Sequence, residues 1–227
     1  MKEIGPDIAV IQRPFRVLGM PLGTTTTVIR LAAGGVLVHS AGPWQCEDVS
    51  AIRDWGKVWG LMEGSRIHDT FALEMRKVFP GGPYGLPAGF PIAAAELEPV
   101  ERLAGWDQRW GAEVRIRRID GMPRLQEHAL LHVPSRTLVL TDLVFNLKFP
   151  PGKSTPWALR WISGLKSFPG TSRLVKLCVK DREAVRKSMA EVMSWDFDQV
   201  VVSHGEIITE DAKTTLRRAL AWGLEPA

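Results

Sequence analysis

The sequence is poor in cysteine and tyrosine, and it contains no long uninterrupted apolar stretch. Its 227 residues include two cysteines and one tyrosine. Cys46 and Cys178 lie too far apart for a zinc knuckle, and free thiols are typical of a reducing compartment. No apolar run approaches the ~20 residues of a membrane span, and the first residues lack the apolar core of a secretory signal. We therefore expect a cytoplasmic protein that has no membrane partner.

An excess of one sign of charge is also nearly absent. The chain has 29 lysines and arginines against 25 acidic residues, a formal net charge of +4. Nucleic-acid-binding domains usually carry a denser basic surface, so we expect no nucleic-acid partner and instead a small-molecule substrate or ligand. An apolar content of 45% is ordinary for a globular protein. The nine tryptophans are consistent with core packing, with the wall of a pocket or with a homodimer interface.

Hydrophobic periodicity predicts strands and helices that follow one another within a single domain, residues 1–227. The pattern predicts strands at 24–31, 36–40, 57–62, 112–119, 128–133, 137–143 and 199–203, and helices at 47–55, 69–79, 155–165, 181–194 and 210–222. Turn residues at 32–35 and 134–136 predict two hairpins. The loop at 80–91 is rich in proline, which fixes φ, so we expect it to be ordered and to form one wall of a cleft beside His68.

Histidine and acidic side chains occur at or just beyond the ends of three predicted strands. His68 and Asp69 follow the strand at 57–62, Asp142 follows the run 137–141, and His204 follows the run 199–203. Imidazole and carboxylate are the ligands of hydrolytic zinc, manganese or iron sites. A strand end holds the backbone firmly while the side chain faces an open edge. These four residues are therefore the candidate metal ligands.

Each candidate also has an ordinary structural interpretation. Asp142 could cap a turn, His204 could belong to a tight turn with the glycine that follows it, and Asp69 could cap a helix. His39, at the end of an inner strand, could support a metal ligand from behind by a hydrogen bond. The alternative for His39 is a buried, hydrogen-bonded histidine with no part in a site.

Two stretches of the chain resemble the metallo-β-lactamase superfamily, in particular a bacterial branch whose metal motif is degenerate. They are HVPSRTLVLTDLVFN, residues 132–146, and WDFDQVVVSHG, residues 195–205. Residues 15–40 resemble the usual start of that branch. The resemblance implies an α+β fold, a four-layer αββα sandwich of two mostly antiparallel mixed sheets with helices on both outer faces. It also implies a site at the sheet edges between the two halves.

The first motif of the superfamily, H-x-H-x-D-H after a strand, is incomplete in this chain. The resemblance places Gly64 and Arg66 at the first two histidine positions. His68 and Asp69 then stand at the Asp-His pair, with the two residue types exchanged. Arg124 falls where another histidine would precede the middle hairpin. The three histidines of the first metal position are therefore missing.

The second metal position keeps its acidic and histidine groups. Asp142 and His204 match the bridging aspartate and the last histidine of the pattern. A two-metal mechanism needs both positions, so the resemblance implies one divalent ion, zinc, iron or manganese, or no metal. Its ligands would be His68, Asp69, Asp142 and His204. Arg66 and Arg124, standing where ligands are lost, could bind an anionic group of a substrate.

We therefore expect a metal-dependent hydrolase with one ion. The ion would activate water against an ester, lactone, amide or phosphate bond. The alternative is a non-catalytic protein of the same fold that binds a ligand or partner in the cleft. The missing first metal position favours this alternative.

Overall fold

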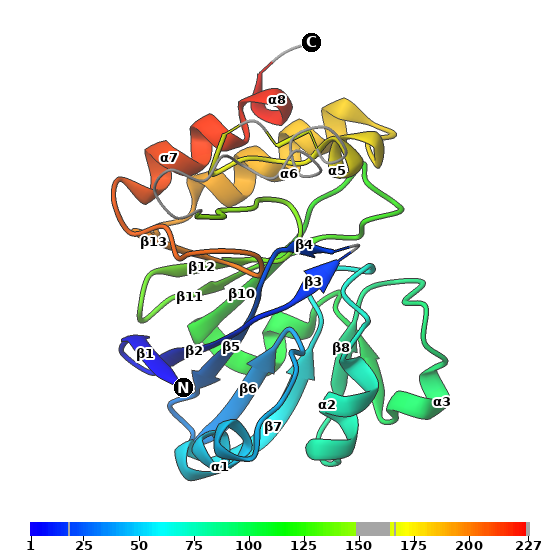
Figure 1. The fold of residues 1–227 in the computed structure, drawn as a ribbon, viewed down its shortest axis with the longest axis vertical. Helices are drawn as coiled ribbons and strands as arrows, with labels where there is room; N and C mark the ends of the chain where they lie inside the picture. Colours follow the sequence, from blue (N-terminus) through cyan, green and yellow to red (C-terminus); the bar gives the residue numbers. More distant parts are fainter. Residues whose placement is uncertain (18, 149–163, 166, 226–227) are drawn as a thin grey trace.

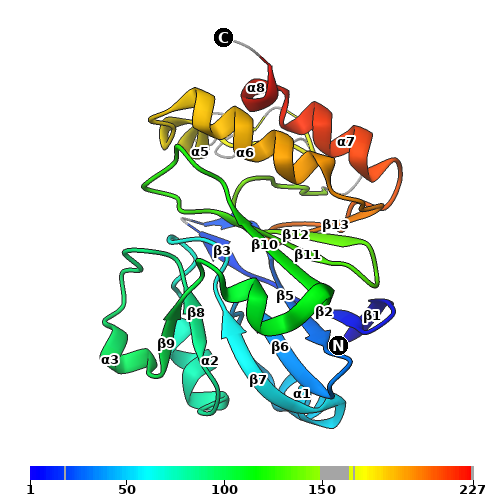
Figure 2. The same ribbon diagram turned by 180° about the vertical axis from the view of Figure 1, so that it is seen from behind.

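The chain folds into four layers, helices outside two facing sheets, which confirms the αββα sandwich (Figures 1 and 2). The computed structural model describes residues 1–17, 19–148, 164–165 and 167–225. The helices on one outer face are α1 (Cys46–Trp55), α2 (Ala72–Val78) and α3 (Ala94–Leu97), and those on the other are α5 (Arg173–Leu177), α6 (Arg182–Ser194), α7 (Ala212–Ala219) and α8 (Ala221–Leu224). Nearly all of the helix predicted at 155–165 lies outside the described residues.

The first sheet is mixed, with the order β1-β2-β5-β6-β7-β8-β9. Its strands are β1 (Lys2–Gly5), β2 (Ile8–Arg13), β5 (Thr24–Arg30), β6 (Gly35–His39), β7 (Lys57–Met62), β8 (Tyr84–Leu86) and β9 (Val100–Arg102). Neighbours from β1 to β6 pair antiparallel, and neighbours from β6 to β9 pair parallel. The predicted hairpin of β5 and β6 is confirmed, with Thr27 opposite His39.

The second sheet has the order β10-β11-β12-β13. Its strands are β10 (Val114–Arg118), β11 (His128–His132), β12 (Thr137–Leu140) and β13 (Gln199–Val202). The hairpin of β11 and β12 is confirmed as antiparallel, whereas β12 and β13 run parallel, with Leu140 opposite Val202. Because parallel strands end at the same edge of a sheet, the residues that follow β12 and β13 meet there.

Two short elements complete the described fold. Strands β3 (Arg16–Val17) and β4 (Met20–Pro21) form a small separate ribbon, and a 3₁₀ segment spans Trp106–Glu113. The sequence patterns predict neither of them. The β3–β4 ribbon lies between the two halves (Figure 1).

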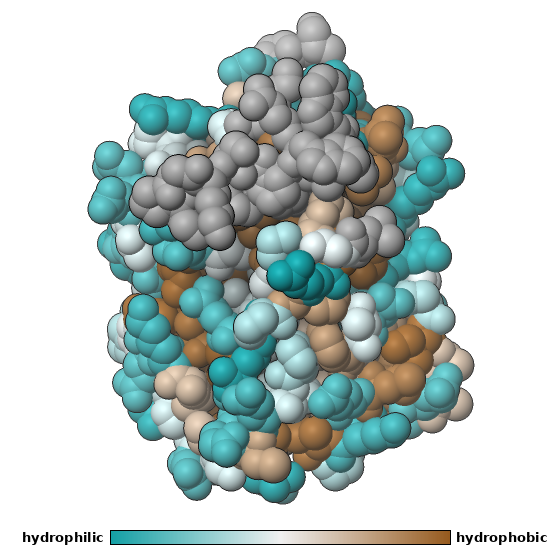
Figure 3. Space-filling view, viewed as in Figure 1, coloured by the Kyte–Doolittle hydropathy of each residue, from teal (hydrophilic) through white to brown (hydrophobic). Residues whose placement is uncertain are grey.

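Apolar side chains fill the space between the sheets and the space under each helical layer. Leu37 of β6, Val139 of β12 and Val201 of β13 belong to the cluster between the sheets. Strands β6 and β12 therefore bury both faces along their whole length. On the outer surface seen in Figure 3, hydrophilic and hydrophobic side chains are intermixed. Among the described residues, no helix has the length and apolar character needed to cross a membrane.

Candidate functional site

His68, Asp142 and His204 come together between the two halves of the sandwich. Asp142 and His204 follow the parallel strands β12 and β13, and the Nε2 atom of His204 lies 3.4 Å from the Oδ1 atom of Asp142. His68 arrives from the segment after β7, and its ring centroid lies 5.8 Å from that of His204. Three of the four predicted ligands thus lie together, and all three line one cavity.

Each of the two imidazole rings is held by a hydrogen bond through its Nδ1 atom. The Nδ1 atom of His204 lies 2.7 Å from the carbonyl oxygen of Gly23. Since a carbonyl oxygen can only accept, Nδ1 carries the hydrogen. The Nδ1 atom of His68 lies 3.2 Å from the Oε2 atom of Glu63. Phe145 stacks on the ring of His204, with centroids 5.2 Å apart, which further fixes that ring.

Glu63 is a buried carboxylate that the sequence patterns do not single out. It accepts hydrogen bonds from the hydroxyl of Tyr84 at 2.7 Å and from the backbone N–H of Ala41 at 3.1 Å. Burial lowers the pKa of His68, but the hydrogen bond and charge of Glu63, with the charges of Asp142 and Glu127, outweigh it and raise that pKa to about 9. His68 is therefore a cation at neutral pH, balanced by Glu63.

Glu127 is a second buried carboxylate, and it supports the backbone that carries Asp142. It accepts hydrogen bonds from the backbone N–H groups of Thr141 at 2.7 Å and Asp142 at 3.1 Å. Burial and the charge of Asp142 raise the pKa of Glu127 to about 8. Burial also opposes ionisation of Asp142, but His204, His68 and Ser65 outweigh it and lower its pKa. Asp142 is thus the ionised member of the pair.

Some buried polar atoms at the site have no hydrogen-bond partner among the described residues. They include the Oδ2 atom of Asp142, the Oγ1 atom of Thr141 and both ring nitrogens of His39. Burial lowers the pKa of His39 to about 3, so this ring is neutral. His39 makes no hydrogen bond to a candidate metal ligand among the described residues, so no contact supports its predicted role of holding such a ligand in place. The free Asp142 oxygen is suited to a hydrogen-bond donor or a cation.

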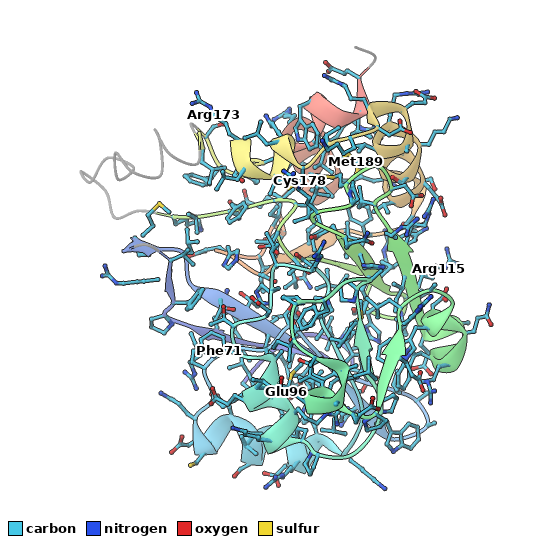
Figure 4. The ribbon with its side chains drawn as sticks, turned by 90° about the vertical axis from the view of Figure 1, so that its right-hand side faces the viewer. Phe71, Glu96, Arg115, Arg173, Cys178 and Met189 are labelled. Atoms are coloured by element: carbon cyan, nitrogen blue, oxygen red, sulfur yellow. The ribbon has the colours of Figure 1, made fainter. Side chains whose placement is uncertain are left out.

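The cavity beside these groups has a volume of about 320 Å³. Its apolar walls include Phe15, Val17, Met20, Phe71, Leu174 and Val175. In Figure 4, Phe71 lies in the lower half of the molecule and Cys178 in the upper half, and both line the cavity. The cavity therefore lies between the two halves, with His68, Asp142 and His204 as its polar groups. Among the described residues, no lysine or arginine lines it.

Asp69, Arg66 and Arg124 do not reach this cavity, which departs from the prediction. Asp69 does not line it, although its two neighbours in sequence do, and its carbonyl accepts a hydrogen bond from Ala72 at the start of α2. The guanidinium of Arg66 lies against Gly89. Arg124 is exposed and also absent from the cavity wall.

The loop 80–91 has a different place from the one predicted. It contributes β8, which pairs with β7 and β9, and none of its residues lines the cavity. Its contribution to the site is indirect, through the hydroxyl of Tyr84 on Glu63.

The residues present have suitable donor chemistry for a cation but not the convergence of a metal centre. Two imidazoles and a carboxylate with a free oxygen are typical ligands of a divalent ion. Within the described ranges, however, no group of three or more His, Cys, Asp or Glu side chains is placed so that it could hold a metal ion.

The buried groups predict that the folded state is most stable near neutral pH. Burial lowers the pKa of His39 from 6.5 to about 3 and that of His128 from 6.5 to about 4, so stability is lost as the pH falls below 6.5. The pKa of Glu127 rises from 4.5 to about 8 and that of His68 from 6.5 to about 9. Their contributions are complete below the unfolded values and disappear as the pH rises through the folded ones.

Urea unfolding midpoints should therefore be highest at about pH 6–7 and fall on both sides. A midpoint that still increases above pH 8 would contradict the shifts of Glu127 and His68.

Comparison with solved structures shows which known fold this is. A metallo-beta-lactamase from Pontibacter korlensis superposes with a TM-score of 0.60 at 12% identity, over 97% of each chain. A fragment of a putative diflavin flavoprotein from Nostoc sp. PCC 7120 gives 0.66 at 12% identity, over 97% of this chain and 94% of that one. A metallo beta lactamase from Erythrobacter litoralis gives 0.56 at 11%, over 98% and 90%. No family model and no curated protein matches the chain.

Proposed function

Since the chain has the metallo-β-lactamase fold, we propose that it binds a small molecule in the cavity between the two halves. The observation that carries this proposal is the cavity itself, about 320 Å³, whose lining residues include Asp142 with one buried and unpartnered carboxylate oxygen. Small-molecule sites are typically concave, mostly apolar and provided with a few convergent polar groups. His68, Asp142 and His204 are those groups here.

A second candidate is the metal-dependent hydrolase with a single ion. The observation that favours it is the pair of imidazoles, each held through Nδ1, beside the free oxygen of Asp142. Ligating histidines usually have their other nitrogen held in this way. When bound, such an ion lowers the pKa of water and polarises an ester, lactone, amide or phosphate oxygen. The residues of this chain would then hold the ion with His68, Asp142 and His204, without Asp69.

A thermal-shift series tests the proposal. Small apolar molecules that differ only in their polar head group are the test ligands. A molecule that binds should raise the unfolding temperature by about 5–10 °C at a concentration one hundred times its Kd. Val17→Trp, at a cavity-lining residue that is 37% exposed, should remove the shift by filling the entrance without burying new volume in the core. The matched control is Leu177→Trp, an exposed residue outside the cavity wall.

The same thermal-shift measurements with and without metal ions distinguish metal-free ligand binding from the metal-dependent hydrolase. Ligand shifts that persist in EDTA support binding without a metal. A shift given by Zn²⁺, Mn²⁺ or Fe²⁺ alone, and lost in His204→Ala but kept in His132→Ala, would make the hydrolase the better conclusion. Absence of any ligand shift in the wild type, with or without metal, contradicts the binding proposal.

A further inference from the structure

One acceptor at the polar end of the cavity has no hydrogen-bond donor among the described residues. Asp142 is 5% exposed and lines the cavity, and its Oδ2 atom has no partner among the described residues. Its Oδ1 atom already faces Nε2 of His204. A buried carboxylate oxygen left without a donor costs folding free energy. A ligand that brings a donor to this oxygen would therefore gain a charge-assisted hydrogen bond.

The charges around the cavity disfavour an anionic ligand. His68, whose Nδ1 atom lies 3.2 Å from the buried carboxylate of Glu63, already has an anionic partner. In the described part of the chain, no lysine or arginine lines the cavity to replace that cation. A ligand carboxylate would have to lie beside the carboxylate of Asp142 in a mostly apolar cavity, where like charges repel.

The rest of the cavity is suited to an aliphatic chain. Its walls are mostly apolar, and three apolar residues that line it are also exposed at the protein surface: Val17 at 37%, Ile67 at 55% and Leu174 at 57%. At roughly 30 Å³ for each water-sized group, the cavity of about 320 Å³ accommodates about ten non-hydrogen atoms. These three residues connect the cavity with the protein surface, which allows an apolar tail of this size to enter.

We infer that the ligand is an apolar molecule of about ten non-hydrogen atoms whose head donates hydrogen bonds to Asp142, as an aliphatic amine or alcohol does. This inference rests on the proposed binding function and specifies its chemistry. Both the amine and the alcohol can donate a hydrogen bond to Asp142, and the amine also places a positive charge opposite its carboxylate. The amine therefore binds more tightly than the alcohol, and the corresponding carboxylic acid, ionised at neutral pH, binds worst.

The two cysteines provide a direct measurement of cavity occupancy. Cys178 lines the cavity, whereas Cys46 is exposed at the start of α1 and does not. Alkylation by N-ethylmaleimide is followed at each residue by peptide mass spectrometry. Octylamine at ten times its Kd should slow modification of Cys178 about tenfold and leave Cys46 unchanged. Octanol should protect at higher concentration, while octanoate and butylamine should protect weakly or not at all.

Two variants of α5 give a matched pair for the tail. Leu174 and Leu177 are both exposed, but only Leu174 lines the cavity. Leu174→Asp should weaken protection by octylamine at least about tenfold, because binding of the apolar tail would remove water from the new carboxylate. Leu177→Asp should leave it unchanged. Each variant is compared with its own rate without ligand, since Cys178 donates a hydrogen bond to the Leu174 carbonyl.

Asp142→Asn tests the head group. Loss of the carboxylate should abolish the preference for octylamine over octanol. Equal or better protection by octanoate in the wild type overturns the inference, and so does unchanged protection in Leu174→Asp. Protection of Cys178 by none of the compounds contradicts the proposed binding function itself. The two failures are thus distinguishable.

Discussion

Replacing Gly64 by alanine is expected to destabilise the fold by about 1–3 kcal/mol, the usual cost of overpacking a filled core. A Cβ atom at this position would lie 2.1 Å from the Oγ1 atom of Thr141 and 2.7 Å from the Nε2 atom of His39. Both neighbours are completely buried. The backbone at Gly64 cannot move away freely, because its carbonyl accepts a 2.7 Å hydrogen bond from the N–H of His128. Urea unfolding of the purified variant measures the loss.

Two further variants test the stated cause. Gly81→Ala is the matched control, because no heavy atom lies within 4 Å of a Cβ built there, and it should leave stability unchanged within about 0.5 kcal/mol. If the contact with Thr141 carries the cost, Gly64→Ala should be less harmful in a Thr141→Ala background. A Gly64→Ala protein as stable as the wild type would show that the site is looser than the structure has it.

The sequence predicts the layers and part of the site because local signals are strong there. The turns at 32–35 and 134–136 lie between apolar runs, and both hairpins form. Asp142 and His204 follow such runs directly, and the parallel pairing of β12 and β13 brings them to one edge. Position at a strand end is therefore sufficient to predict that these two side chains meet.

Glu63, Asp69 and Arg66 show what local patterns leave undetermined. Glu63 directly follows β7, and a carboxylate just after an apolar strand was the available signal. Its partners Tyr84 and His68 come from separate segments, however, so only the tertiary fold reveals the network. The directions of Asp69 and Arg66 depend on where α2 begins and on the course of the loop that contains Gly89. Arg66 in particular lies against a residue more than twenty positions away in sequence.

Glu63→Gln is expected to cost the most of any single change at the site, about 3–5 kcal/mol, the penalty for breaking a buried ion pair. The Oε1 atom of Glu63 accepts from Tyr84 and Ala41, and its Oε2 atom faces Nδ1 of His68. A glutamine amide can keep only one of these sides as an acceptor. Its NH₂ group would then meet either existing donors or the Nδ1–H of His68.

The same substitution should change the titration of His68 in a defined direction. Burial alone lowers the pKa of His68, and the hydrogen bond and charge of Glu63 are the largest effects that raise it to about 9. In Glu63→Gln the pKa of His68 should therefore fall below 9, which NMR titration of the imidazole measures directly. The loss of stability should also be greater at pH 6 than at pH 10, where the wild-type His68 has already lost its proton.

The exposed pair of Lys148 and Glu206 provides the matched control for charge removal. Their side chains are 71% and 53% exposed, and the two charged atoms lie 2.7 Å apart. Glu206→Gln should cost less than about 1 kcal/mol, because water screens surface ion pairs. Similar costs for Glu63→Gln and Glu206→Gln, or an unchanged pKa of His68 in Glu63→Gln, would mean that Glu63 is not its partner. Asp142 would then have to be the main anion that holds His68 charged.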